Sequence, residues 1–123
     1  KKILVCALLF STVFALSNRL PPTYLTRTAE QTAWNEKMTS ALSVIPSDAN
    51  VAATNSPSGQ LTQRKELYCI YTADDLKNIP DFVEYYVVRL DGSQKTEKIL
   101  KEINSGDYKE FFREDGVVAI YKK

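Results

Sequence analysis

The sequence has no histidine and only two cysteines, and these absences exclude several kinds of site. Without histidine the chain has no His general base, no Ser-His or Cys-His nucleophile pair, and too few ligands for most catalytic zinc sites. The cysteines, Cys6 and Cys69, lack the spacing of a metal-binding pair, and we expect both thiols to be buried, as free cysteines usually are. The sequence therefore predicts no metal site and no bound cofactor.

Phosphate-binding loops and strongly charged surfaces are also missing. The four glycines are scattered along the chain, so they do not form the G-x-G-x-x-G spacing of a phosphate-binding loop. The formal net charge of +1 provides neither a basic field for nucleic acid nor an acidic field for cations. We therefore expect no nucleic-acid partner.

Two pairs of neighbouring acidic residues are the remaining candidates for acid–base chemistry. Asp74-Asp75 lies in a polar connection and Glu114-Asp115 lies in a hairpin, where a helix start or exposure to solvent explains them. A carboxylate without a second carboxylate placed opposite it is weak evidence for catalysis. We therefore expect no catalytic residue in this chain.

The first seventeen residues, KKILVCALLFSTVFALS, are mostly apolar after two lysines and allow two interpretations. One is a signal peptide with a small-x-small cleavage site at Ala15-Leu16-Ser17. The other is the end of a transmembrane helix, although residues 3–17 would rise only about 22 Å, less than the roughly 30 Å hydrocarbon core. Both interpretations place the lysines in the cytoplasm and the rest of the chain outside it.

A short linker and one folded domain are expected after the apolar segment, which we assign to residues 1–20. Pro21-Pro22 should end the apolar helix and give a stiff exit from the membrane surface over residues 21–28. The composition, 44% hydrophobic and 25% charged, is that of an ordinary globular protein. We assign residues 29–123 to a single extracytoplasmic domain.

The domain should begin with a helix over residues 29–44. Thr28 and Gln31 match a capping box, and Trp34, Met38 and Leu42 form one apolar stripe at helical spacing. This stripe predicts that the helix packs on a core.

Strand patterns and a second helix follow. Apolar or alternating runs predict strands at VAATN, ELYCIYT, FVEYYVVRL and on both sides of Asp115-Gly116, where the last two form a hairpin. A helix capped by Ser93 and stopped at Gly106 should form a parallel, right-handed crossover. The predicted fold class is α/β, a small mixed sheet of about five strands with a packing helix before the first strand and a crossover helix.

The segment TNSPSGQLTQR, residues 54–64, leaves the first predicted strand and is the candidate binding site. In open α/β sheets, ligands sit outside the carboxyl ends of parallel strands. Asn55 offers an amide, Ser58 and Gly59 could begin a helical turn that attracts an anion, and Arg64 offers a fork for phosphate or carboxylate. The candidate substrate-facing residues are Asn55, Ser58, Gln60, Arg64 and Tyr68.

These residue types are also common in turns, so a second interpretation stays open. Arg64 would then pair with Asp48 or Glu66 at the surface. Because Arg64 lies in a polar loop, we expect its truncation to change the free energy of unfolding by no more than about 0.5 kcal/mol.

The stretch ALSVIPSDANVAATNSPSGQLTQRKELYCIY, followed by EYYVVRLD, resembles the C-terminal soluble region of a family of uncharacterised, multi-spanning bacterial and archaeal membrane proteins. The layout of that family is related to GT-C type glycosyltransferases, which use lipid-phosphate sugars. The matching residues are Ile45, Pro46, Val51, Ala52, Ala53, Asn55, Leu61, Arg64, Tyr68, Tyr86, Val87, Val88 and Asp91. Thr62 replaces the usual serine, and Lys1–Leu16 would fit a last membrane helix.

The resemblance implies the C-terminal extracytoplasmic domain of a polytopic membrane protein, beside an active site in the membrane. In GT-C enzymes the catalytic acidic residue lies in an early external loop, so the resemblance transfers no catalytic residue to this chain, which should not be active alone. The domain would help to bind substrate or acceptor, and its partners would be the membrane, a lipid-phosphate sugar and the rest of the protein. The alternative is a small exported binding or interaction protein with a cleaved signal peptide.

Overall fold

The computed structural model describes the backbone of residues 22–123 and the side chains from residue 28 onward. The chain divides into two compact units, residues 1–33 and 34–123, and the second contains the α/β domain. The expected apolar helix and Cys6 lie outside the described residues. Among the helices that are described, none is both long enough and apolar enough to cross a membrane.

Helix α2 (Pro22–Leu42) begins earlier than the sequence pattern indicated. Proline suits the first turn of a helix, because the N–H that it lacks would have no acceptor within the helix there. Residues 22–28, expected as a linker, are therefore helical. Thr28 lies inside the helix instead of beginning it, and its carbonyl oxygen accepts a hydrogen bond of 2.8 Å from the hydroxyl of Thr32.

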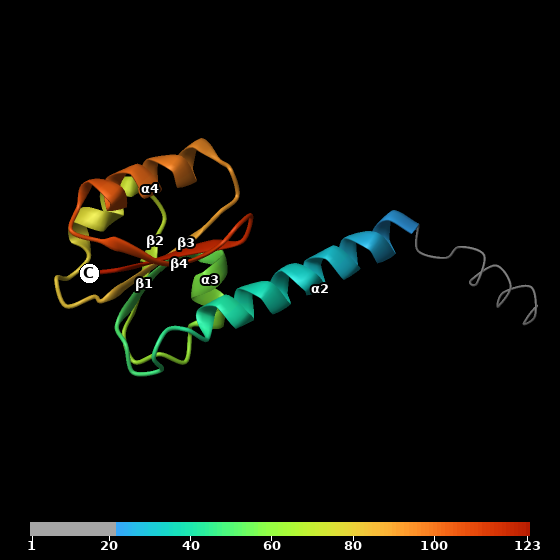
Figure 1. The fold of residues 1–123 in the computed structure, drawn as a ribbon, viewed down its shortest axis with the longest axis horizontal. Helices are drawn as coiled ribbons and strands as arrows, with labels where there is room; N and C mark the ends of the chain where they lie inside the picture. The colour runs from blue at the N-terminus through green and yellow to red at the C-terminus, as the bar shows by residue number, and fades with distance from the viewer. Residues whose placement is uncertain (1–21) are drawn as a thin grey trace, which may run out of the picture. The chain divides into compact units, whose positions relative to one another are not determined.

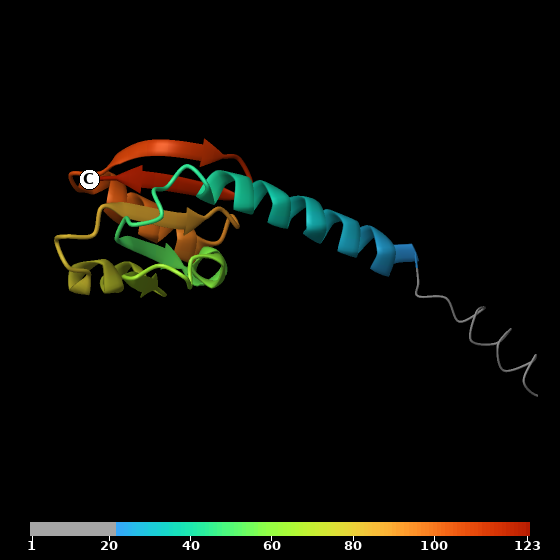
Figure 2. The same ribbon diagram turned by 90° about the horizontal axis from the view of Figure 1, so that it is seen from below.

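A five-stranded mixed sheet confirms the predicted fold class. The strands are β1 (Val51–Thr54), β2 (Leu67–Ile70), β3 (Tyr85–Arg89), β4 (Lys109–Glu114) and β5 (Val118–Lys122). Their order across the sheet is β2-β1-β3-β5-β4, as Figure 2 shows. Strand β1 is parallel to β2 and β3, so the carboxyl ends of these three strands meet at one edge of the sheet, which we call the carboxyl edge.

Three helical segments connect the strands (Figure 1). They are α3 (Asn55–Gln60) between β1 and β2, the 3-10 helix η1 (Ala73–Asn78) between β2 and β3, and α4 (Gln94–Ser105) between β3 and β4. Ser93 caps α4 as predicted, since its hydroxyl oxygen accepts a hydrogen bond from the Thr96 amide.

Each face of the sheet has its own hydrophobic core. On the face that carries α3 and the end of α2, the buried residues are Met38, Ala41, Leu42, Ile45, Ala49, Val51, Ala53, Leu61, Tyr85, Val87, Val117, Val118 and Ile120. On the face that carries α4 and η1, they are Ala52, Ile70, Val83, Tyr86, Val88, Ile99, Ile103, Ala119 and Tyr121. Neighbouring residues of one strand enter opposite cores, as the period of two requires. Strand β3, the third strand of the chain, is central in the sheet and contributes to both cores.

The C-terminal hairpin explains why β4 does not lie next to β3, as a simple crossover through α4 would place it. Gly116 has a positive φ of 72°, and the turn that it forms with Asp115 pairs β4 with β5 in antiparallel orientation. Strand β5, and not β4, pairs with β3. The expected strand-helix-strand unit is formed by β3, α4 and β4. Its two strands run in the same direction, but they are not neighbours, because β5 lies between them.

The prediction that Cys69 is buried was wrong. This residue lies on β2, which forms one edge of the sheet, and its thiol is free and exposed. An edge strand has a neighbour on one side only, so an apolar run in the sequence does not ensure burial there.

Candidate functional site

The candidate site lies where the chain leaves the carboxyl ends of β1 and β3. These strands are parallel neighbours, but β1 continues into α3 on one face of the sheet and β3 leads to α4 on the other. A crevice opens outside a parallel sheet where neighbouring connections depart to opposite faces, and ligands of open α/β proteins bind in such crevices. The topology therefore singles out the carboxyl edge between β1 and β3.

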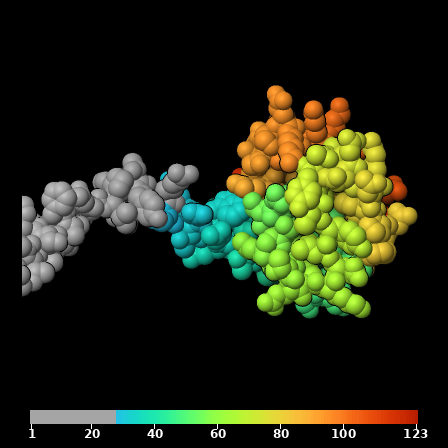
Figure 3. Space-filling model, turned by 180° about the vertical axis from the view of Figure 1, so that it is seen from behind, coloured from blue at the N-terminus to red at the C-terminus, as the bar shows by residue number. Residues whose placement is uncertain are grey.

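A polar cavity of about 210 Å³ lies at this position, and we call it the carboxyl-edge pocket. It is lined by Thr54, Asn55, Ser56, Ile70, Tyr71, Arg89, Asp91, Lys95, Thr96 and Ile99. These residues come from the ends of β1, β2 and β3 and the residues just after them, from the start of α3 and from α4. In Figure 3 the surface of α4, in orange, borders the green and yellow surface of the segments that follow β1 and β2.

Arg89, the last residue of β3, is held in place by three contacts. Its guanidinium Nη1 donates a hydrogen bond of 2.7 Å to the hydroxyl of Ser56, and its guanidinium carbon lies 5.1 Å from the centre of the Trp34 ring. Its backbone N–H donates to the Thr54 hydroxyl at 2.9 Å, which joins the ends of β1 and β3. A cation is thus positioned at the mouth of the crevice.

Asp91 provides the negative charge of the pocket. Its Oδ1 accepts hydrogen bonds from the Ser93 amide at 2.9 Å and from the Thr96 hydroxyl at 2.7 Å. The amide and hydroxyl hydrogen bonds, helped by the charge of Arg89, lower the pKa of Asp91 to about 2. This carboxylate is therefore ionised at neutral pH, and it also fixes the loop that leads into α4.

The predicted site residues do not converge at one place. Asn55 lies in the carboxyl-edge pocket, but Ser58 is buried and its hydroxyl donates to the Asn55 carbonyl oxygen at 2.6 Å. Helix α3 starts at Asn55, and not at Ser58, so Ser58 does not begin a helical turn. Tyr68 is half-buried, with its ring 6.0 Å from that of Phe82.

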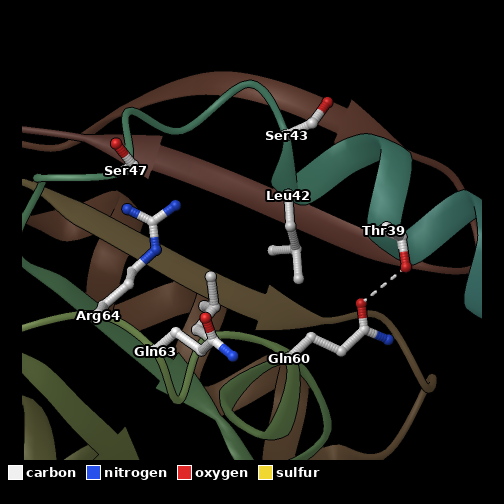
Figure 4. A pocket seen from close by; sticks show the side chains of 8 residues that line it. Thr39, Leu42, Ser43, Ser47, Gln60, Gln63 and Arg64 are labelled. Carbon is white, nitrogen blue, oxygen red and sulfur yellow. Dashed lines mark hydrogen bonds between the residues drawn. The ribbon is translucent and has the colours of Figure 1, made fainter.

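Gln60 and Arg64 line a different and larger cavity, of about 640 Å³, between the end of α2 and the chain after α3. Figure 4 shows its lining, with Gln60 accepting a hydrogen bond of 3.1 Å from the Thr39 hydroxyl. Arg64 donates to two backbone carbonyl oxygens, that of Ile45 at 3.0 Å and that of Pro46. Desolvation lowers the pKa of Arg64, although the negative charge of Asp48 opposes this effect.

These contacts indicate a structural role for Arg64. It ties the loop after α2 to the chain that follows α3, because its guanidinium donates to the carbonyl oxygens of two neighbouring residues of that loop, Ile45 and Pro46. Neither the expected ion pair with Asp48 nor that with Glu66 is formed.

Sequence reasoning did not propose Arg89, Asp91 or Lys95 as residues of the site, although they line the carboxyl-edge pocket. The signal was present, because Arg89 lies at the end of the third predicted strand and Asp91 and Lys95 come soon after it. Applying the rule about carboxyl ends to every parallel strand, and not to the first alone, would have found them.

Comparison with known proteins adds no relative. No protein-family model, curated protein or solved structure matches the chain. In the part of the chain that the structure describes, there is also no group of three His, Cys, Asp or Glu side chains that could hold a metal ion. The function is therefore inferred from the residues of the carboxyl-edge pocket and from the sequence.

Proposed function

We propose that this chain is the C-terminal extracytoplasmic domain of a polytopic membrane protein with the layout of GT-C type glycosyltransferases. In this role the domain helps to bind the polar part of a lipid-phosphate sugar or of the acceptor. The observation that supports a binding role is the carboxyl-edge pocket, where polar side chains gather at the switch point between β1 and β3. The attachment to a membrane rests on the apolar sequence Lys1–Leu16 and on the resemblance.

The pocket is suited to binding because its polar groups are already held in position. Ser56 and Trp34 orient Arg89, and the Ser93 amide orients Asp91. Because these groups are ordered before the ligand binds, binding loses less conformational entropy. The proposal assigns no chemical step to this pocket, and the resemblance places catalysis in another part of the protein.

The structure changes the residues to which this role is assigned. Asn55 remains, while Arg89, Asp91 and Lys95 replace the other predicted residues, which do not line the pocket: Ser58, Gln60, Arg64 and Tyr68. Arg64 keeps the chain folded near α2 and is no longer proposed to contact substrate.

Labelling of Cys69 tests the location. Because this thiol is exposed, a membrane-impermeant maleimide should reach it in intact cells that produce the whole protein, in a variant whose only cysteine is Cys69. Labelling of intact cells and of lysed cells should be equal, and a Cys69→Ser variant controls for background. Labelling that appears only after lysis would show that the domain is cytoplasmic and would refute the proposal.

N-terminal sequencing separates the proposal from the alternative of a small exported protein. Recovery of the segment Lys1–Leu16 in the membrane-bound product supports a retained membrane helix. A mature product that starts at Asn18 supports export with cleavage after Ser17.

A further inference from the structure

We propose that the carboxyl-edge pocket selects a compact ligand that carries one negative charge, on a carboxylate or a phosphodiester, next to a hydroxyl group. This inference rests on the proposed binding role of the pocket and adds the class of ligand. Its volume of about 210 Å³ is below the range of roughly 300–1,000 Å³ typical of small-molecule sites, so it fits one such group and not an extended molecule.

Arg89 provides the hydrogen-bond donors for the anion. An arginine has five N–H donors, and Nη1 of Arg89 is engaged by Ser56 while the face of the guanidinium lies near Trp34. Within the described part of the chain, Nε and Nη2 make no hydrogen bond. This edge of the guanidinium is therefore available to two oxygens of a carboxylate or a phosphate group.

The charges of the lining favour a single negative charge on the ligand. Arg89 and Lys95 are cations and Asp91 is an anion, so the lining has one net positive charge. A monoanion neutralises this charge. A dianion would leave a second negative charge close to Asp91, and such a repulsive contact selects against it.

Asp91 is the reason why we expect a hydroxyl group on the ligand. Its Oδ1 accepts two hydrogen bonds from the protein, from the Ser93 amide and the Thr96 hydroxyl. Among the described residues, none donates to Oδ2, which can accept a hydrogen bond from the ligand. A hydroxyl donor fits better than an ammonium group, because an ammonium group would add a third positive charge to a lining that already contains two cations, Arg89 and Lys95.

A matched series of ligands derived from glycerol tests this selection. Calorimetric titration of the full chain in a nonionic detergent, at about pH 8, compares glycerate, glycerophosphoglycerol, glycerol 3-phosphate and glycerol. Phosphate monoesters are dianions at this pH because their second pKa is about 6. We expect glycerate or glycerophosphoglycerol to bind about five to ten times more tightly than glycerol 3-phosphate, and glycerol to bind weakest. Which of the two monoanions binds more tightly distinguishes a carboxylate ligand from a phosphodiester ligand.

Two variants with matched controls test the residues. Asp91→Asn should reduce the preference for a monoanion over glycerol 3-phosphate to about twofold or less, because it removes the repulsive charge. Asp107→Asn, an exposed carboxylate outside the pocket, should leave the preference unchanged. Lys95→Gln should weaken monoanion binding about fivefold, while Lys98→Gln, farther along α4 and outside the lining, should not.

The inference is overturned if neither monoanion binds, if glycerol 3-phosphate binds as tightly as both, or if a folded Asp91→Asn variant keeps the full preference. If Asp91→Asn does not fold, unchanged binding by Lys95→Gln overturns it. A failure of this inference leaves the proposed location standing, since labelling of Cys69 in intact cells does not depend on any ligand. Labelling only after lysis would refute the location and leave the ligand class unaffected.

Discussion

The guanidinium carbon of Arg89 lies 5.1 Å from the centre of the Trp34 ring, and this contact joins the C-terminal part of α2, from Trp34 onward, to the end of β3. The two residues are far apart in the sequence, one on the first described helix and the other at the end of the central strand β3. The ring attracts the cation electrostatically and so stabilises its position. The arginine side chain is therefore ordered before a ligand binds. Trp34 is therefore a positioning residue for Arg89.

Replacing Trp34 by leucine should weaken binding of glycerate or glycerophosphoglycerol, whichever binds more tightly to the native chain, about threefold to fivefold, because Arg89 loses the ring that orients it. Trp34→Phe should recover part of this loss, since phenylalanine keeps an aromatic face with a smaller quadrupole. Calorimetry is the suitable measurement, because Trp34 is the only tryptophan of the chain and its replacement removes the fluorescence signal. Equal affinities for the leucine and phenylalanine variants would show that the ring acts only by packing.

Arg64→Ala should destabilise the domain by about 1–3 kcal/mol, because it removes charged hydrogen bonds to the Ile45 and Pro46 carbonyl oxygens. The sequence alone led to the opposite expectation, a change of no more than about 0.5 kcal/mol. Chemical denaturation measures the free energy of unfolding, and Lys65→Ala, which truncates the exposed neighbour, serves as the control. If both variants are equally stable, Arg64 is not a structural tie.

The sequence predicts the elements of this fold because their signals are local. Ser93 caps α4, Gly106 follows its last turn, and Asp115-Gly116 forms the hairpin, each as expected from residues close in the chain. The pairing of β5 with β3 depends on which strand reaches β3 across the sheet, and no local pattern encodes that choice. The start of α2 at Pro22 was missed because proline is compatible with either the end of one helix or the beginning of another.

The candidate site was only partly predictable, for a related reason. Asn55 was found because it directly follows a predicted strand. Arg89 becomes a site residue only because β1 and β3 are neighbours and because Trp34 reaches it, and both facts are tertiary. The role of Arg64 depends on carbonyl oxygens that lie in a loop before β1, and the sequence pattern gives no indication of that contact.

Val87→Asp should prevent stable folding. Val87 is in the central strand β3 and is 0% exposed, so an aspartate there would bury a charge without a partner. The expected loss is at least about 4 kcal/mol, a large share of the stability of a domain of this size. Val44→Asp, which changes a valine that is 38% exposed, is the matched control and should unfold near the temperature of the native chain. Circular dichroism during heating measures both, and a cooperative transition at the native temperature for Val87→Asp would contradict the burial of this strand.

The contribution of Asp91 to stability should disappear in acid. Its pKa in the folded chain is about 2, lower than its ordinary value of 3.8, because the folded state donates hydrogen bonds to the ionised carboxylate. A lowered pKa means that the unfolded chain takes up the proton first, so the stabilisation is present above about pH 4 and is lost as the pH falls toward 2. The difference in melting temperature between the native chain and Asp91→Asn should therefore be constant from neutral pH down to about pH 5 and shrink below it. Asp107→Asn should show no such change, and a difference that stays constant down to pH 2 would mean that the Ser93 and Thr96 donors do not act on the charged form of Asp91.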